Sequence, residues 1–143
     1  MAKLTLQQAD QIIAGALAKA AEMKLNPLTI AVVDDGGHMK AFKRQDGPGA
    51  ALRPHVAYGK AFGAVGMGAS TRVLEQRAKD RPHFFSALSD VAQGRLVPVP
   101  GGVLIRDAAN EVIGAVGVSG DTSDNDEAAA LAGIASAGLK SDA

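Results

Sequence analysis

Cysteine and tryptophan are absent from this 143-residue chain, and aromatic residues make up only 3% of it. Without cysteine, the chain has neither a disulfide framework nor a thiolate metal site or nucleophile. No apolar run approaches the roughly 20 residues needed to cross a bilayer. The first residues, MAKLTLQQADQ, are polar and acidic where a signal peptide has an apolar segment. We therefore expect a soluble, cytoplasmic protein with no membrane partner.

A single domain, residues 1–143, is expected from the length, and an apolar content of 47% is enough for a folded core. Alanine occurs 28 times, so small aliphatic side chains are predicted to dominate that core. Small side chains let helices and strands approach closely. They also leave room for contacts between subunits or for a flat ligand.

Charge is balanced over the whole chain but uneven along it. Residues 40–81 contain nine Lys or Arg and three acids, whereas residues 107–143 contain one Lys and seven acids. These two segments are predicted to complement one another, within a subunit or between subunits, or to frame a site for an anion. Nucleic acid is not an expected partner, because no basic run has aromatic residues interleaved for stacking.

The hydrophobic pattern predicts an α+β protein, an antiparallel sheet packed by helices. The sequence Asp34-Asp35-Gly36-Gly37 is a strong turn between two strands. Helices are predicted over residues 5–23, 51–67, 72–79, 84–92 and 125–137, and extended segments over 28–33, 39–43, 96–100, 103–106 and 112–118. Prolines in the segment 96–100 confine it to a sheet edge or a connection.

The stretch GVSGDTSDNDE, residues 117–127, joins the end of a predicted strand to the start of a helix. Its acids suit the positive end of the helix dipole and are interpreted first as caps. Alternatively, a carboxylate here faces a ligand and accepts its proton. These four acids are Asp121, Asp124, Asp126 and Glu127. Their spacing lacks the central Gly and distal Glu of a calcium loop, so no metal site is predicted.

Arg53 and His55 fall in the first turn of a predicted helix, with Lys60 further along it. A cation in a first turn is electrostatically unfavourable, which indicates an anionic ligand or a partner carboxylate. His55 titrates near neutral pH and could act as an acid or a base. The alternative is an ordinary histidine on the surface.

His83 precedes two phenylalanines, which suit either a flat ring ligand or the edge of the core. Haem iron could be ligated by a histidine, by Tyr58 or by a methionine. Motifs for phosphate loops, dinucleotides, zinc proteases and serine hydrolases are absent: GxxxxGK, GxGxxG, HExxH and GxSxG.

Three segments carry a recognisable pattern: TIAVVDDGGHMKAFKRQDG, AYGKAFGA and VPGGVLIRDAANEVIGAVGVSGDTSDNDEAA. Together they resemble the GlcG/HbpS family, also found as the C-terminal domain of PduO-type proteins. The resemblance covers residues 29–139 and implies a profilin-like fold, a five-stranded antiparallel sheet flanked by helices, assembled into dimers or octamers. Family members bind or degrade haem, and others belong to small-molecule catabolism.

The family's motifs fall on particular residues of this chain. Its Val-Asp-x-Gly-Gly turn corresponds to residues 33–37. Its Lys-Ala and Gly-Gly-Val motifs correspond to residues 60–61 and 101–103. Its Ser-Gly…Asp-Glu motif corresponds to Ser119, Gly120, Asp126 and Glu127. By this resemblance we predict that Gly101, Gly102 and Ser119 bind the ligand, together with Asp121 and Glu127.

Two functions are compatible with these residues. The first, which we favour, is a homo-oligomer that binds haem or another tetrapyrrole. Relatives that bind haem use a histidine near the first helix, and one also a cysteine. Neither is present here, so His55 or His83 is the expected axial ligand.

The second function is a cofactor-free isomerase, tautomerase or lyase acting on a small organic acid. Arg53 would then hold the carboxylate, and His55 would move the proton. Asp124 or Asp126 would orient the imidazole, with Lys60 in the same catalytic group. A third possibility is a scaffold or chaperone subunit without pocket chemistry.

Overall fold

The computed structural model describes residues 3–142 as five helices and five strands. In chain order they are α1 (Leu6–Met23), β1 (Thr29–Asp34), β2 (Met39–Arg44), α2 (Arg53–Met67), α3 (Thr71–Asp80), α4 (Pro82–Val91), β3 (Gly102–Arg106), β4 (Val112–Ser119), α5 (Ser123–Ser136) and β5 (Lys140–Asp142). None of the helices in this range is long and apolar enough to span a membrane.

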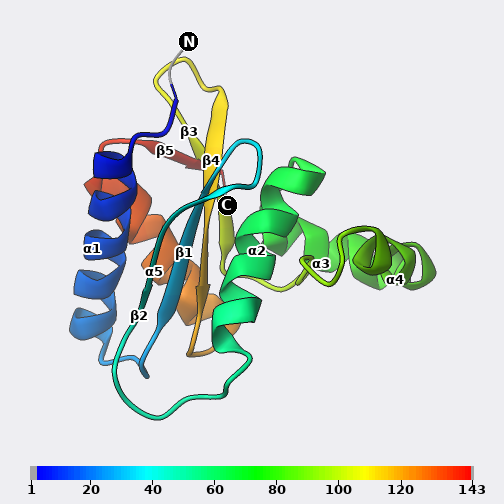
Figure 1. Cartoon of the computed structure of the whole chain (residues 1–143), viewed down its shortest axis with the longest axis horizontal. Coiled ribbons are helices and arrows are strands. Elements are labelled where there is room, and N and C mark those ends of the chain that lie inside the picture. The colour runs from blue at the N-terminus through cyan, green and yellow to red at the C-terminus, as the bar shows by residue number, and fades with distance from the viewer. Residues whose placement is uncertain (1–2, 143) are drawn as a thin grey trace.

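The strands form one sheet in the order β2-β1-β4-β3-β5, and every neighbouring pair is antiparallel. Figure 1 shows α1 and α5 on one face of this sheet and α2 on the other, with α3 and α4 projecting to the side. The predicted α+β class and its five-stranded antiparallel sheet are therefore confirmed.

Helix α1 forms as its sequence predicts. Thr5 accepts a hydrogen bond from the Gln8 amide, and the Gln8 side chain accepts one from Thr5, which completes a capping box. The helix buries Ile12, Ile13 and Ala16 against the sheet and α5. Burial of this apolar stripe is what stabilises the helix in place.

Helix α2 lies very close to the other face of the sheet. A Cβ at Gly117 would overlap the carbonyl oxygen of Ala57, and one at Gly102 would overlap that of Lys60. Ala61 and Ala64 pack on Val33 and Leu104 in the same layer. The expected core of small side chains is therefore present here, and it lets α2 approach the sheet closely.

The fifth strand and the start of the last helix differ from the expected elements. Residues 96–100 form a connection, which is one of the two alternatives expected for this segment, with Val97 and Leu96 packed on the glycines of α2. The fifth strand is instead β5, three polar, exposed residues paired with β3. The last helix begins at Ser123 and not at Asn125, because Thr122 provides the N-cap by accepting a hydrogen bond from the Asn125 amide.

Candidate functional site

A buried ion pair lies between α2 and the start of α5. Lys60 Nζ is 3.2 Å from Asp126 Oδ2, and each side chain is 3% exposed. Lys60 also donates to the Val118 carbonyl at 2.8 Å, and Asp126 Oδ1 accepts from the Asp121 amide at 2.9 Å. The pair therefore joins α2 to the end of β4 and to α5.

Burial determines the titration of both partners. It lowers the pKa of Lys60 and raises that of Asp126, since each charged form loses hydration. In each case the charge of the other residue opposes the shift. The two groups, which come from separate candidate motifs, satisfy one another inside the protein.

Gly101 and Gly102 lie beside this pair. An added Cβ at Gly101 would stand 2.7 Å from Lys60 Nζ, and Gly101 has a φ of 127°, so a larger residue fits neither the space nor the backbone. Thr71 Oγ1 accepts from the Gly102 amide and donates to its carbonyl. The two glycines thus allow Lys60 to pass close to the backbone.

The other acids of residues 117–127 also have partners. Asp124 and Glu127 both bind Arg72 on α3, which was not among the predicted site residues. Asp121 accepts from the side chain of Asn125 and from the amides of Asn26 and Thr122. These hydrogen bonds, Asn125 first, lower the pKa of Asp121, and the positive charge of Arg53 adds to the effect. Within residues 3–142, no three acids or histidines are arranged to hold a metal ion.

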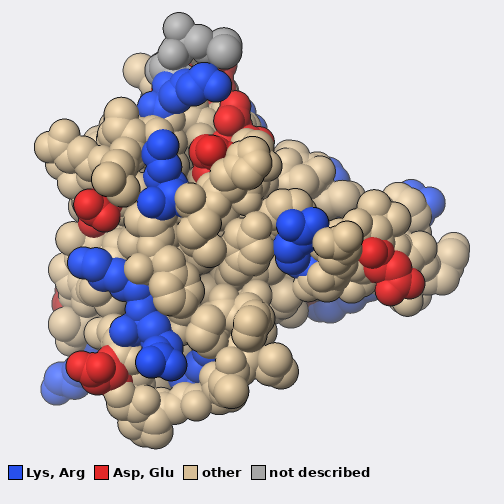
Figure 2. Space-filling view, in the orientation of Figure 1, with Lys and Arg blue, Asp and Glu red and all other residues tan. Residues whose placement is uncertain are grey.

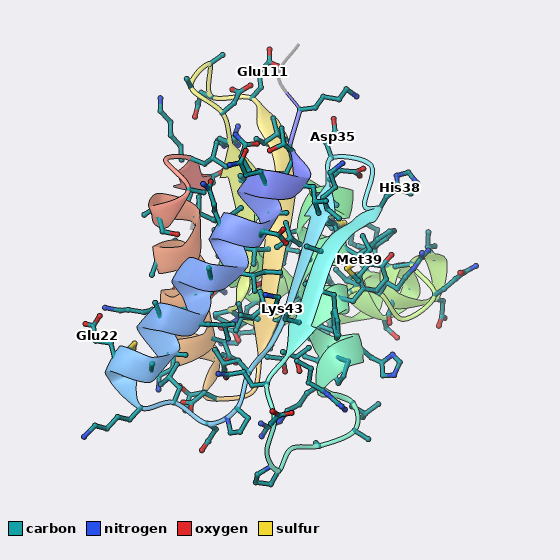
Figure 3. The ribbon with its side chains drawn as sticks, turned by 60° about the vertical axis from the view of Figure 1, so that its left-hand side comes forward. Glu22, Asp35, His38, Met39, Lys43 and Glu111 are labelled. Carbon is teal, nitrogen blue, oxygen red and sulfur yellow. The ribbon has the colours of Figure 1, made fainter. Side chains whose placement is uncertain are left out.

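The histidines lie on the surface. His55 and His83 are exposed, and their imidazoles make no hydrogen bond to residues 3–142. His38 follows the turn between β1 and β2, points outward in Figure 3, and has its Nδ1 3.5 Å from Asp34. No hydrogen bond or ion pair in the described range joins His55 to Asp124 or Asp126. An acid–base role for His55 stays a prediction.

An apolar groove runs between the end of α2 and α4. It has a volume of about 310 Å³. Arg95 lines it, with its guanidinium carbon 4.1 Å from the centre of the Phe62 ring and its Nε donating to the Ala92 carbonyl. The lining residues are Phe62, Gly63, Gly66, Met67, Leu88, Val91, Ala92, Arg95 and Leu96.

Gly66 gives this groove a flat wall. A Cβ there would meet only Phe62 Cε1, at 4.0 Å, so close packing does not explain the glycine. Glycine inside a helix costs about 1 kcal/mol relative to alanine. Gly63, one turn earlier, differs because Leu96 packs directly on it. Of these two glycines, only Gly63 is required by close packing.

A second, polar pocket lies where α2 begins, and its volume is about 190 Å³. Its walls include Thr29 of β1, Arg44 of β2 and Arg53, together with the loop that follows β2. Arg53 Nη1 donates to the Pro27 carbonyl at 3.3 Å. Figure 2 shows basic side chains over β2, the edge strand that leads into this loop.

The model of one protein family, described as haem degrading protein HbpS-like, matches residues 4–135. The chain belongs to the HbpS-like family. This agrees with the resemblance noted from the sequence. No curated protein matches the chain.

Solved structures share the HbpS-like fold. PduOC in complex with haem is 23% identical, with a TM-score of 0.86 over 99% of this chain and 100% of that one. Protein ORFY of Klebsiella pneumoniae is 27% identical, with a TM-score of 0.84 over 96% and 93% of the two chains. A double mutant of HbpS from Streptomyces reticuli is 30% identical, with a TM-score of 0.81 over 94% and 87%.

Proposed function

We propose that this protein binds a tetrapyrrole, haem in the first instance, in the groove between α2 and α4. Membership of the HbpS-like family supports haem as the ligand, and a relative of the same fold has been crystallised with haem. We place the ligand in this groove because its lining is apolar and includes Gly66, a glycine that close packing does not require.

The lining of the groove suits such a ligand. A tetrapyrrole is flat and apolar in its ring, which matches Gly66 and the apolar side chains of Leu88 and Leu96. Its propionates need a cation, and Arg95 is among the residues that line the groove. Met67 supplies a thioether, which is a known ligand of haem iron.

The groove is small for a whole macrocycle. Its volume of about 310 Å³ is at the lower end of the range for small-molecule sites. One edge of the ring would therefore be buried here. We expect a second subunit to cover the remainder, in keeping with the dimer or octamer that the family resemblance implies.

Binding is favoured over the enzyme alternative by the contacts of the proposed catalytic residues. Asp126 is held by Lys60 and Asp124 by Arg72, so neither carboxylate orients His55. A proton relay needs an oriented base within hydrogen-bond reach of its partner. A cytoplasmic location and a place in small-molecule catabolism stay predictions.

A haemin titration of the purified protein, followed by its Soret band, tests the proposal. We expect a saturable shift at about one haem per chain. Gly66→Leu places a branched side chain in the groove and should lower haemin affinity by about fivefold to 150-fold, because overlap in a packed site costs about 1–3 kcal/mol. Ala18→Leu makes a similar exposed change on α1, across the sheet, and should bind as the wild type does.

Three further variants identify the iron ligand. Met67→Leu keeps the shape of the side chain but removes the sulfur, so it should alter the Soret maximum while haemin still binds. His55→Ala and His83→Ala test the ligands expected from the sequence in the same way. A broad, non-saturating change that is equal in all variants would exclude specific haem binding.

A further inference from the structure

Three polar side chains line up across the sheet beneath the start of α2. The register places Thr29 of β1 opposite Arg44 of β2 on one side and opposite Ser119 of β4 on the other. Side chains alternate along a strand, so Thr29 shares the face of Ala31 and Val33, and Ser119 shares the face of Gly117. That is the face covered by α2, where Gly117 meets Ala57.

Two residues of this row are largely buried, and their hydroxyls have no hydrogen-bond partner. Thr29 is 2% exposed and Ser119 is 6% exposed. Neither side chain makes a hydrogen bond to residues 3–142. No fully enclosed side-chain oxygen or nitrogen among residues 3–142 lacks a partner, so the Thr29 hydroxyl is accessible from the polar pocket that Thr29 lines. The hydroxyl is therefore available to a molecule in that pocket.

The electrostatics of the pocket favour an anion. Arg53 stands at the first position of the 15-residue helix α2, whose first turn no side chain caps. The positive end of the helix dipole and two guanidinium groups, Arg44 and Arg53, thus act on the same space. The nearby acids are Asp46, which lines the pocket, and Asp121, which is occupied by its own hydrogen bonds.

The walls of the pocket are held in place without a ligand. Gln45 forms two hydrogen bonds with Leu28. Its backbone amide donates to the Leu28 carbonyl, and its side-chain oxygen accepts from the Leu28 amide. Asp121 accepts from the Asn26 amide on the far side of the same segment. The loop and the start of β1 are therefore positioned before any ligand enters.

We infer that this pocket binds a small carboxylic acid, with its carboxylate on Arg53 and an adjacent oxo or hydroxyl group on Thr29. An arginine fork matches the two oxygens of a carboxylate. A volume of about 190 Å³ suits a ligand of a few heavy atoms and is too small for a tetrapyrrole. The carboxylate of Asp46 in the wall disfavours a doubly charged phosphate.

This site is separate from the proposed tetrapyrrole groove. The groove is lined from Phe62 onward on α2, whereas the pocket involves only the first two residues of that helix. The inference does not depend on haem binding, and either can fail without the other.

Calorimetric titration with pyruvate, a 2-oxo acid of suitable size, tests the inference. Saturable binding to the wild type is expected. Arg53→Gln should weaken it by about tenfold or more, since hydrogen bonds to a charged group contribute about 1.5–3 kcal/mol. Thr29→Val keeps the shape and strand propensity of the side chain and should weaken binding by about threefold to tenfold.

Lys43→Gln is the matched control, because it removes one positive charge from β2 without touching the pocket lining. Lys43 is labelled in Figure 3 beside α1, on the other face of the sheet. Pyruvate affinity should be unchanged in this variant. Unfolding midpoints of all variants show whether a loss of binding comes from a loss of folding.

Three results would overturn the inference. One is no pyruvate binding by a folded wild type, and another is equal weakening in Lys43→Gln and Arg53→Gln, which would reflect net charge alone. The third is tighter binding of inorganic phosphate than of pyruvate, since the pocket would then be a phosphate site.

Discussion

The two ends of helix α2 differ in almost every property that governs ligand binding. Its start meets polar side chains from three strands, with two arginines around a pocket of about 190 Å³. Its end meets the apolar face of α4 across a groove of about 310 Å³. One helix therefore contributes to two sites of opposite polarity, and the partner element decides the polarity of each.

The middle of α2 serves neither site directly but positions both. Its alanines and glycines bring it against the sheet, and Lys60 ties it to β4 and α5. A cation at this depth is stable only because a carboxylate and a carbonyl oxygen face it. If this anchor fails, both ends of the helix should move.

Lys60→Met should have the largest effect, on the stability of the protein and on ligand binding at both ends of α2. It leaves Asp126 buried without its counter-ion, and removing one partner of a buried pair costs about 3–5 kcal/mol. Urea unfolding should show this loss of stability, and binding of haemin and of pyruvate should both weaken. The double variant Lys60→Met/Asp126→Leu should regain part of the stability, since no buried charge remains. Equal stability of the single variant and the wild type would show that Lys60 is not an anchor.

Asp121→Asn should lower the stability of the folded protein by less than Lys60→Met does, because it removes a carboxylate near Arg53, at the start of α2. The carboxylate of Asp121 is stabilised in the folded protein, chiefly by the hydrogen bond from Asn125, so its pKa lies below the usual 3.8. It contributes stability above about pH 4 that is lost as the pH falls through the lower folded pKa. The variant should be less stable than the wild type at pH 7, with a difference that shrinks towards pH 2. A difference that stayed constant with pH would rule out this ionisation as the cause.

Arg72→Gln should have the smallest effect. Arg72 binds Asp124 and Glu127 at the start of α5, but its side chain is 46% exposed. Exposed ion pairs contribute about 0–1 kcal/mol, and salt screens them. Unfolding in low and high salt should show a small loss that salt removes. A loss as large as that of Lys60→Met would contradict the distinction between the buried and the exposed pairs.

Much of this arrangement could be predicted from the sequence. The basic segment 40–81 and the acidic segment 107–143 do complement one another within the subunit, through Lys60 with Asp126 and Arg72 with Asp124 and Glu127. The antiparallel sheet could be predicted from the turn after β1 and from the order of helical and extended segments along the chain. Local patterns of this kind are set by neighbouring residues, so one chain is enough to read them.

Features that depend on distant contacts could not be predicted in this way. Strand β5 is polar and exposed, so only its pairing with β3 marks it as a strand. Thr29 is one residue of an apolar strand. Only the register of the sheet shows that Ser119 and Arg44 lie beside it and that its hydroxyl has no partner. The apolar groove likewise needs the packing of α4 near α2, which no periodicity encodes.

The most direct test of the tetrapyrrole site is a haemin titration of three proteins side by side: the wild type, Gly66→Leu and Arg53→Gln. A saturable Soret shift is expected in all three proteins, with haemin affinity lowered in Gly66→Leu and unchanged in Arg53→Gln. Weaker binding by Arg53→Gln with full affinity in Gly66→Leu would contradict the groove as the haem site, because haem would then bind at the start of α2 and not at its end.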